Sequence, residues 1–294
     1  MECKTFEPFD SLTEGASKVY ALRRCDGIIR AFRRHGPSQV IEASGSPRAS
    51  AAVELSVVVP VRNEQDNILP LLAEIHAALD KRCEFEVVYV DDGSGDATVR
   101  VLTEALSSYP RLRVLAHRRS CGQSAALFTG VRAARAAWIA TLDGDGQNDP
   151  ADLPMLLAAR DDPARPANLQ LITGYRRSRQ DRWLKRISSR IANGVRSRLL
   201  GDATPDTGCG LKLILRSTYL DLPFFDHMHR FLPALVQRNG GATLSVDVHH
   251  RPRARGRSNY GVLDRLWVGI VDLFGVMWLR RRMQRPEPTE LTRP

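Results

Sequence analysis

The fold is decided by the stretch LSVVVPVRNEQDNILPLLAEIHAALDKRCEFEVVYVDDGSGDAT, residues 55–98. It begins with a continuous apolar run at 55–61, which is typical of a strand buried on both faces of a parallel sheet. Residues 67–79 carry apolar side chains at helical spacing, and the β-branched and aromatic run 85–90 predicts a second strand. This strand–helix–strand order predicts an α/β fold with a mostly parallel, Rossmann-like sheet flanked by helices.

The same alternation continues toward the C-terminus. Helices are predicted at 96–106, with Asp96 as cap, and at 123–134, and strands at 112–116 and 138–142. Because open parallel sheets bind ligands beyond the carboxyl ends of their strands, we expect a site formed by the residues after these strands, namely 62–64, 91–94 and 143–147.

Composition sets the class of protein. The 294 residues are 43% hydrophobic and 26% charged, which is enough apolar material for a globular core. Five scattered cysteines without a CxxC pair argue against a disulfide framework or a zinc site, and favour a reducing cytoplasm. We find neither an apolar h-region at the N-terminus nor an uncharged apolar run of about 18 residues, so neither a secretory signal nor a transmembrane helix is expected.

The net charge of +10 is unevenly distributed. Residues 176–198 hold 9 basic and 1 acidic side chains, and 249–285 hold 9 and 2, whereas 51–175 hold 12 and 17. A protein that coats nucleic acid more often spreads its cations over the whole fold. Two compact basic blocks favour binding to a small polyanion or to an anionic membrane surface, and nucleic acid is not an expected partner.

Two acidic turns carry the candidate chemistry. In VDDGSGDAT, 90–98, Asp91 and Asp92 follow a strand and could accept hydrogen bonds from a nucleoside, although an Asx-capped turn explains them as well. In TLDGDGQNDP, 141–150, Asp143, Asp145 and Gln147 alternate with glycines and offer hard oxygen ligands suited to Mg²⁺ or Mn²⁺. A calcium-binding or solvated acidic loop is the alternative, but the EF-hand spacing fails here.

Residues 55–150 resemble the nucleotide-sugar domain of family-two inverting glycosyltransferases with the GT-A fold. The resemblance rests on SVVVPVRNE (56–64), VDDGSGDAT (90–98), GQSAALFTGVRAA (122–134) and DGDGQNDP (143–150). It implies that the nucleotide-sugar site is lined by Pro60, Arg62, Glu64, Asp91, Asp92, Gln123 and Asp143. It also implies that Asp143, Asp145 and Gln147 hold the divalent metal at the diphosphate, with Asp145 counted as catalytic.

The second half is similar to the polyisoprenyl-phosphate branch of that family, which includes dolichol-phosphate mannosyltransferases and bacterial undecaprenyl-phosphate sugar transferases. The resemblance covers about residues 54–282 and implies that a basic helical segment grips the lipid phosphate. The candidates are Arg176, Lys185, Arg186 and Arg190; a solvated basic helix face is the alternative.

Two further motifs complete the predicted site. DTGCGLKLILRS, 206–217, supplies Asp206, which the resemblance places near the reacting centre as an orienting or sugar-contacting carboxylate. A nucleophilic Cys209 is disfavoured, because no recognised cysteine-enzyme signature surrounds it. HRPRARGRSNYG, 250–261, is a loop that could close over the diphosphate through Arg251, Arg257 and Ser258, with Arg253 and Arg255 beside them. His249 and His250 are adjacent, which disfavours a two-histidine metal site.

Residues 264–282, DRLWVGIVDLFGVMWLRRR, are amphipathic, and their 14-residue apolar stretch is too short to span a bilayer. An interfacial helix on an anionic membrane and a helix packed on protein explain the pattern equally well. The predicted organisation is an N-terminal extension at 1–53, partly disordered, a catalytic domain at 54–261, a membrane-interface helix at 262–283 and a disordered tail at 284–294.

These features together predict metal-dependent, inverting transfer of a sugar from a UDP- or GDP-sugar to a polyisoprenyl phosphate. The enzyme is expected to be peripheral on the cytoplasmic face of the cell membrane, either bound to lipid or docked on a separate transmembrane subunit. A homo-oligomer is left open. One alternative is transfer to a saccharide or another acceptor that is not a lipid phosphate, in cell-envelope polysaccharide synthesis. A remote alternative, motivated by the charge, is a basic nucleic-acid-binding module.

Overall fold

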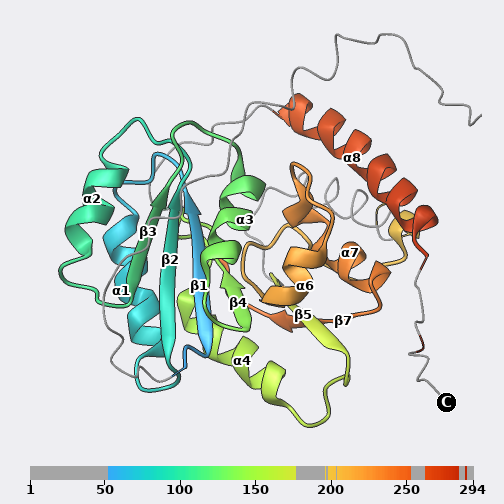
Figure 1. The fold of residues 1–294 in the computed structure, drawn as a ribbon, viewed down its shortest axis with the longest axis horizontal. Coiled ribbons are helices and arrows are strands. Elements are labelled where there is room, and N and C mark those ends of the chain that lie inside the picture. Colours follow the sequence, from blue (N-terminus) through green and yellow to red (C-terminus); the bar gives the residue numbers. More distant parts are fainter. Residues whose placement is uncertain are drawn as a thin grey trace, which may run out of the picture. The chain divides into compact units, whose positions relative to one another are not determined.

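The computed structural model describes residues 52–176, 196, 198–202, 204–252, 262–284 and 289, and the side chains of the last helix from residue 268. Its centre is a seven-stranded sheet in the order β3-β2-β1-β4-β6-β5-β7 (Figure 1). The strands are β1 Leu55–Val61, β2 Phe85–Asp91, β3 Leu112–Ala116, β4 Trp138–Thr141, β5 Leu169–Tyr175, β6 Lys212–Leu215 and β7 Ala242–Asp247.

Helices cover both faces of this sheet. They are α1 Ile68–Leu79, α2 Thr98–Ala105, α3 Gln123–Ala133, α4 Leu153–Asp161, α6 Arg216–Asp221, α7 Leu232–Arg238 and α8 Val262–Arg282. Helices α1, α2 and α4 pack on one face through a core that includes Leu72, Leu102 and Leu156. Helices α3, α6, α7 and α8 belong to the core of the other face. The strand β1 is buried at every residue because it lies between β2 and β4 and between both helical layers.

The elements predicted between residues 55 and 142 are confirmed, with ends that differ by one or two residues. Asp96 does accept a hydrogen bond from the Thr98 amide at 3.0 Å, although Ala97 occupies the cap position. The sheet is mixed, because β6 runs antiparallel to both β4 and β5. The parallel order β3-β2-β1-β4 brings the carboxyl ends of these four strands to one edge of the sheet, where the acidic turns follow.

Helix α3 lies very close to the sheet, because Gly130 faces the side chains of Val58 and Val90 with no room for a Cβ atom. This approach fixes the N-terminus of α3 beside the ends of β2 and β4, so the residues at 121–123 reach both acidic turns.

Helix α8 packs on the protein through one side and exposes the other. Val276 is buried, with 1% of its surface exposed, whereas Phe274 and Trp278 are 63% and 59% exposed. Asp272, which interrupts the apolar sequence, lies 3.3 Å from His227 Nδ1, in the segment that joins α6 to α7. Neither α8 nor any other described helix is long and apolar enough to cross a membrane. The predicted extension up to residue 51 and the tail at 285–288 and 290–294 lie outside the described residues.

Candidate active site

The acidic turn after β4 is held against the start of β6. Asp143 Oδ1 accepts a hydrogen bond from Gln123 Nε2 at 2.8 Å, and its carboxylate lies against the backbone of Gly210, where no Cβ atom would fit. Burial and the neighbouring Asp145 raise the pKa of Asp143, while Lys212 and Arg176 oppose that rise. Two carboxylates and a nearby amide are thus gathered at one point of the sheet edge.

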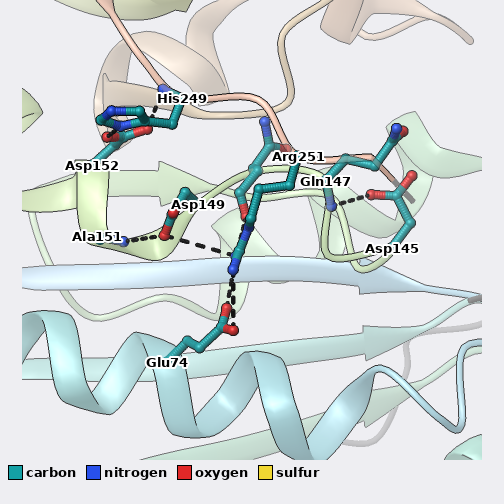
Figure 2. A network of polar contacts seen from close by, with 9 residues as sticks. Glu74, Asp145, Gln147, Asp149, Ala151, Asp152, His249 and Arg251 are labelled. Carbon is teal, nitrogen blue, oxygen red and sulfur yellow. Dashed lines mark hydrogen bonds and ion pairs between the residues drawn. The ribbon is translucent and has the colours of Figure 1, made fainter. Parts of the chain in front are cut away.

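Asp145 and Gln147 lie on the outer part of the same turn (Figure 2). Asp145 Oδ1 accepts a hydrogen bond from the Gln147 amide at 3.1 Å, so the carboxylate organises the turn while remaining partly exposed. Asp143, Asp145 and Gln147 all carry the hard oxygen donors that Mg²⁺ and Mn²⁺ prefer. Burial and repulsion by Asp145 raise the pKa of Asp143, and a bound cation would relieve that repulsion, so the residues present fit a divalent metal.

Asp206 and Arg176 form a buried, bidentate ion pair next to this turn. Arg176 Nε and Nη2 donate to the two carboxylate oxygens of Asp206 at 2.7 and 2.9 Å. Only 10% and 7% of the two side chains are exposed. The prediction that Arg176 belongs to a basic helix is wrong, because it directly follows β5 and is not in a helix. Its guanidinium is held by Asp206, the residue that the resemblance predicts to lie near the reacting centre.

Lys212 is a buried residue that the sequence analysis missed. Only 4% of its surface is exposed, and its ammonium donates a hydrogen bond to the Cys209 carbonyl. Burial lowers the pKa of Lys212, while Cys209, Asp143 and Asp206 oppose that change. A lone lysine in the apolar strand sequence GLKLIL was the available signal. Burial also raises the pKa of the Cys209 thiol, which agrees with the view that Cys209 is not a nucleophile.

The two carboxylates that follow β2 accept hydrogen bonds from other groups of the protein. Asp91 Oδ2 accepts the amides of Gly93 and Ser94, both at 3.1 Å, which is the Asx-turn alternative for this residue. Asp92 accepts four hydrogen bonds of 2.7–2.9 Å, from His117, Ser120 and the amides of Cys121 and Gly122. Both carboxylates therefore shape the turns around the predicted nucleotide site.

We expect Asp92→Asn to destabilise the protein by about 2 kcal/mol at neutral pH, because an amide cannot replace a carboxylate that accepts four hydrogen bonds. Burial alone would raise the pKa of Asp92, but these hydrogen bonds outweigh it and lower the pKa below 3.8. The stability difference should therefore be complete above pH 3.8 and shrink as the pH falls through the folded-state pKa. Urea unfolding of both proteins across this range is the measurement; a difference independent of pH would contradict the assignment.

Three more predicted nucleotide contacts lie at the end of β1 and in the loop that follows it. Pro60 is buried within β1, and its carbonyl lies beside Gly144 of the acidic turn. Arg62 is exposed at the strand end, and Glu64 accepts a hydrogen bond from Asn67 Nδ2 at 2.6 Å. All three lie at the same edge of the sheet as Asp143, and their contact with a nucleotide stays a prediction.

Arg251 is tied to the protein rather than free for a phosphate (Figure 2). Its guanidinium donates to both oxygens of Glu74 on α1, at 3.1 and 2.7 Å, and lies 3.7 Å from Asp149. This arrangement differs from the predicted one, in which Arg251 contacts the diphosphate, because the guanidinium of Arg251 already lies beside two carboxylates. Nearby, His249 pairs with the buried Asp152 through its backbone amide and Nδ1, both at 2.7 Å.

Several predicted residues cannot be placed. The lipid-phosphate candidates Lys185, Arg186 and Arg190 lie outside the described residues, and so do the diphosphate candidates Arg257 and Ser258. Within the described ranges, Asp92, His117 and Cys121 bring ligand-type atoms within 4.8 Å of one another. Both imidazole nitrogens of His117 already have partners, Asp92 and Thr129, so we interpret this group as a polar network.

Known proteins similar to this chain share its sequence over most of the described domain. The chain is 36% identical over 247 residues to the dodecaprenyl-phosphate galacturonate synthase of Rhizobium johnstonii, covering 80% of this chain and 70% of the relative. It is 34% identical over 212 residues to the undecaprenyl-phosphate 4-deoxy-4-formamido-L-arabinose transferase of Edwardsiella ictaluri, covering 71% of this chain and 63% of that relative. The chain thus spans somewhat less than two thirds of the second protein.

Solved structures share the fold at low sequence identity. A mannosyltransferase from Pyrobaculum calidifontis, in complex with GDP-Man and Mn²⁺, matches with a TM-score of 0.59 at 21% identity, covering 82% of this chain and 69% of that one. Glucosyl-3-phosphoglycerate synthase from Mycobacterium tuberculosis, with Mn²⁺, UDP and phosphoglyceric acid, matches with a TM-score of 0.58 at 20% identity, covering 79% and 80%. Residues 56–222 match the glycosyl transferase family 2 domain, and the chain therefore belongs to that family of glycosyltransferases.

Proposed function

We propose that this glycosyltransferase moves a sugar from a nucleoside diphosphate sugar to a polyisoprenyl phosphate, with inversion at the anomeric carbon, at the cytoplasmic face of the membrane. The observation that carries the proposal is the placement of Asp143 and Asp145 beside the Asp206–Arg176 pair at the carboxyl edge of the sheet. The relatives named above, whose printed names give dodecaprenyl and undecaprenyl phosphate, support the choice of acceptor.

Asp143, Asp145 and Gln147 would hold Mg²⁺ or Mn²⁺ in this site. When bound, the metal supplies Lewis-acid stabilisation of the charge on the departing diphosphate. Gln123 keeps the Asp143 carboxylate turned toward the sheet edge through its 2.8 Å hydrogen bond. Asp206, held at both oxygens by Arg176, is fixed in orientation to contact the sugar of the donor.

A phosphate acceptor explains why we assign no general base. The second pKa of a phosphate monoester is about 6, so the attacking oxygen is already ionised near neutral pH. The protein must then bring two anions together, and this requires basic side chains more than it requires a general base. After Arg176, the sequence at 177–198 carries 8 such residues and is the segment we propose for the lipid phosphate.

The test is a transfer assay with the purified full chain. The protein is incubated with Mn²⁺ or Mg²⁺, a short polyisoprenyl phosphate and a panel of UDP- and GDP-sugars, and lipid products are identified by mass spectrometry. A polyisoprenyl-phosphate sugar should form from one donor of the panel. Transfer to added oligosaccharides with no lipid product would instead support the saccharide-acceptor alternative.

We further propose that the exposed side of α8 lies on the membrane surface. Ile270, Val271, Phe274 and Trp278 form an apolar stripe, and Arg280, Arg281 and Arg282 follow it. Apolar side chains beside a basic helix end suit the headgroup region of an anionic membrane. The opposite side of α8 contacts the protein through Val276, so the catalytic domain and the membrane would share this helix.

The double variant Phe274→Ser/Trp278→Ser should bind mixed phosphatidylcholine and phosphatidylglycerol vesicles about tenfold more weakly or worse, because two large exposed apolar side chains are lost. Vesicle co-sedimentation measures this, and thermal unfolding should change little. Leu69→Ser is the matched control, since Leu69 is 48% exposed on α1. Equal loss of binding in the control, or none in the double variant, would contradict the docking of α8.

A further inference from the structure

Lys212 is a buried residue next to the acidic turn that follows β4. It is paired in the sheet with Thr141 of β4 and with Thr173 of β5, and 4% of its surface is exposed. Its ammonium donates to the carbonyl of Cys209, the residue before Gly210. Since Gly210 is the backbone against which the Asp143 carboxylate rests, Lys212 and Asp143 meet at the same short turn.

The charges around this turn are nearly balanced without a metal. Asp143 is acted on by two cations, Lys212 and Arg176, and by the neighbouring carboxylate Asp145. Arg176 also has a bidentate partner in Asp206, which takes up its charge. Lys212 has the neutral Cys209 carbonyl as its hydrogen-bond partner, and its charge acts on both Asp143 and Asp206.

We propose that Lys212 is a positioning residue that makes divalent-metal binding at Asp143 and Asp145 depend on the nucleotide; the inference rests on the proposed function. A buried cation repels an incoming divalent ion strongly, because the protein interior screens charges poorly. The metal affinity of the nucleotide-free site is therefore reduced. The diphosphate of the donor brings negative charge that offsets Lys212, so metal and nucleotide bind together and, after transfer, metal and nucleoside diphosphate leave together.

The proposal predicts a measurable coupling. Mn²⁺ affinity is measured by electron paramagnetic resonance on the full chain, without nucleotide and with saturating UDP or GDP, and the ratio of the two dissociation constants is the coupling factor. In Lys212→Met and Lys212→Gln, the nucleotide-free site should bind Mn²⁺ more tightly, and the coupling factor should fall by about tenfold or more. Lys212→Arg keeps the charge and should keep the coupling.

Thr173→Val is the matched control, because Thr173 pairs with Lys212 in the sheet but directs its hydroxyl to Leu244 and Ser245. It should show the wild-type coupling factor. An unchanged factor in the two neutral variants, or a wild-type protein without coupling, would overturn the proposal. Misfolding of both neutral variants beside a folded Lys212→Arg, seen by circular dichroism, would also count against it. If neither UDP nor GDP binds the wild-type protein, the proposed donor class fails instead.

Discussion

Asp145→Asn should lower sugar transfer about a thousandfold or more while the protein remains folded. The side chain is half-buried at the outer part of the acidic turn, and the change removes one of the proposed anionic metal ligands with almost no change in volume. Stabilisation of a departing diphosphate by a bound metal contributes several kcal/mol, and about 4 kcal/mol corresponds to three decades in rate. Initial rates of lipid-linked sugar formation, taken at several Mn²⁺ concentrations, measure the effect.

Asp149→Asn is the matched control for this prediction. Asp149 lies in the same turn and caps the short 3-10 helix Pro150–Asp152 by accepting the Ala151 amide at 3.0 Å. It also lies 3.7 Å from Arg251, so its replacement should cost some stability and little activity. An Asp145→Asn enzyme that regains the wild-type rate with saturating metal would show that Asp145 is not required for catalysis.

Arg176→Ala should destabilise the protein by about 3–5 kcal/mol, because it removes the bidentate cationic partner of the buried Asp206 carboxylate. The loss should appear in the urea midpoint of unfolding. Transfer should fall as well, mainly in kcat, since Asp206 would lose its fixed orientation beside Asp143. This expectation differs from the role drawn from the sequence, in which Arg176 binds the lipid phosphate; loss of such a contact would raise the KM for that substrate.

The double variant Arg176→Met/Asp206→Leu separates the two roles of this pair. Removing both charges leaves no buried carboxylate at residue 206, so stability should recover most of the loss. Activity should not recover, because no carboxylate remains at residue 206. A variant at residue 176 alone that keeps normal stability and kcat but has a raised lipid KM would instead support the phosphate-binding role.

The sequence predicted the first half of the fold well for a physical reason. Buried parallel strands are continuous apolar runs, and the helices between them carry apolar side chains at regular spacing, so both patterns are local. The antiparallel β6 was missed because it has only four residues, too few for a clear periodic pattern. Its place between β4 and β5 depends on pairing across the whole domain, which no short window of sequence contains.

Some residues of the candidate site could likewise be predicted from local sequence, and others could not. Asp143, Asp145 and Gln147 could be proposed from the sequence because they follow one strand at regular spacing. The partners of Arg176 and Arg251 were not found, because Asp206 lies 30 residues away and Glu74 lies 177 residues away along the chain. A run of basic residues in the sequence gives only the net charge of a segment. Which cation of a basic block meets a carboxylate is decided by the tertiary fold.

The N-terminus of α3 has a consequence for recombining these enzymes. Gly122 donates its amide to Asp92 after β2, and Gln123 donates its side chain to Asp143 after β4, so two adjacent residues join both acidic turns. A chimera that takes one acidic turn from a relative and leaves the other in place would inherit a helix start matched to only one of them. Segment exchange intended to change the donor should therefore transfer residues 117–123 together with both turns.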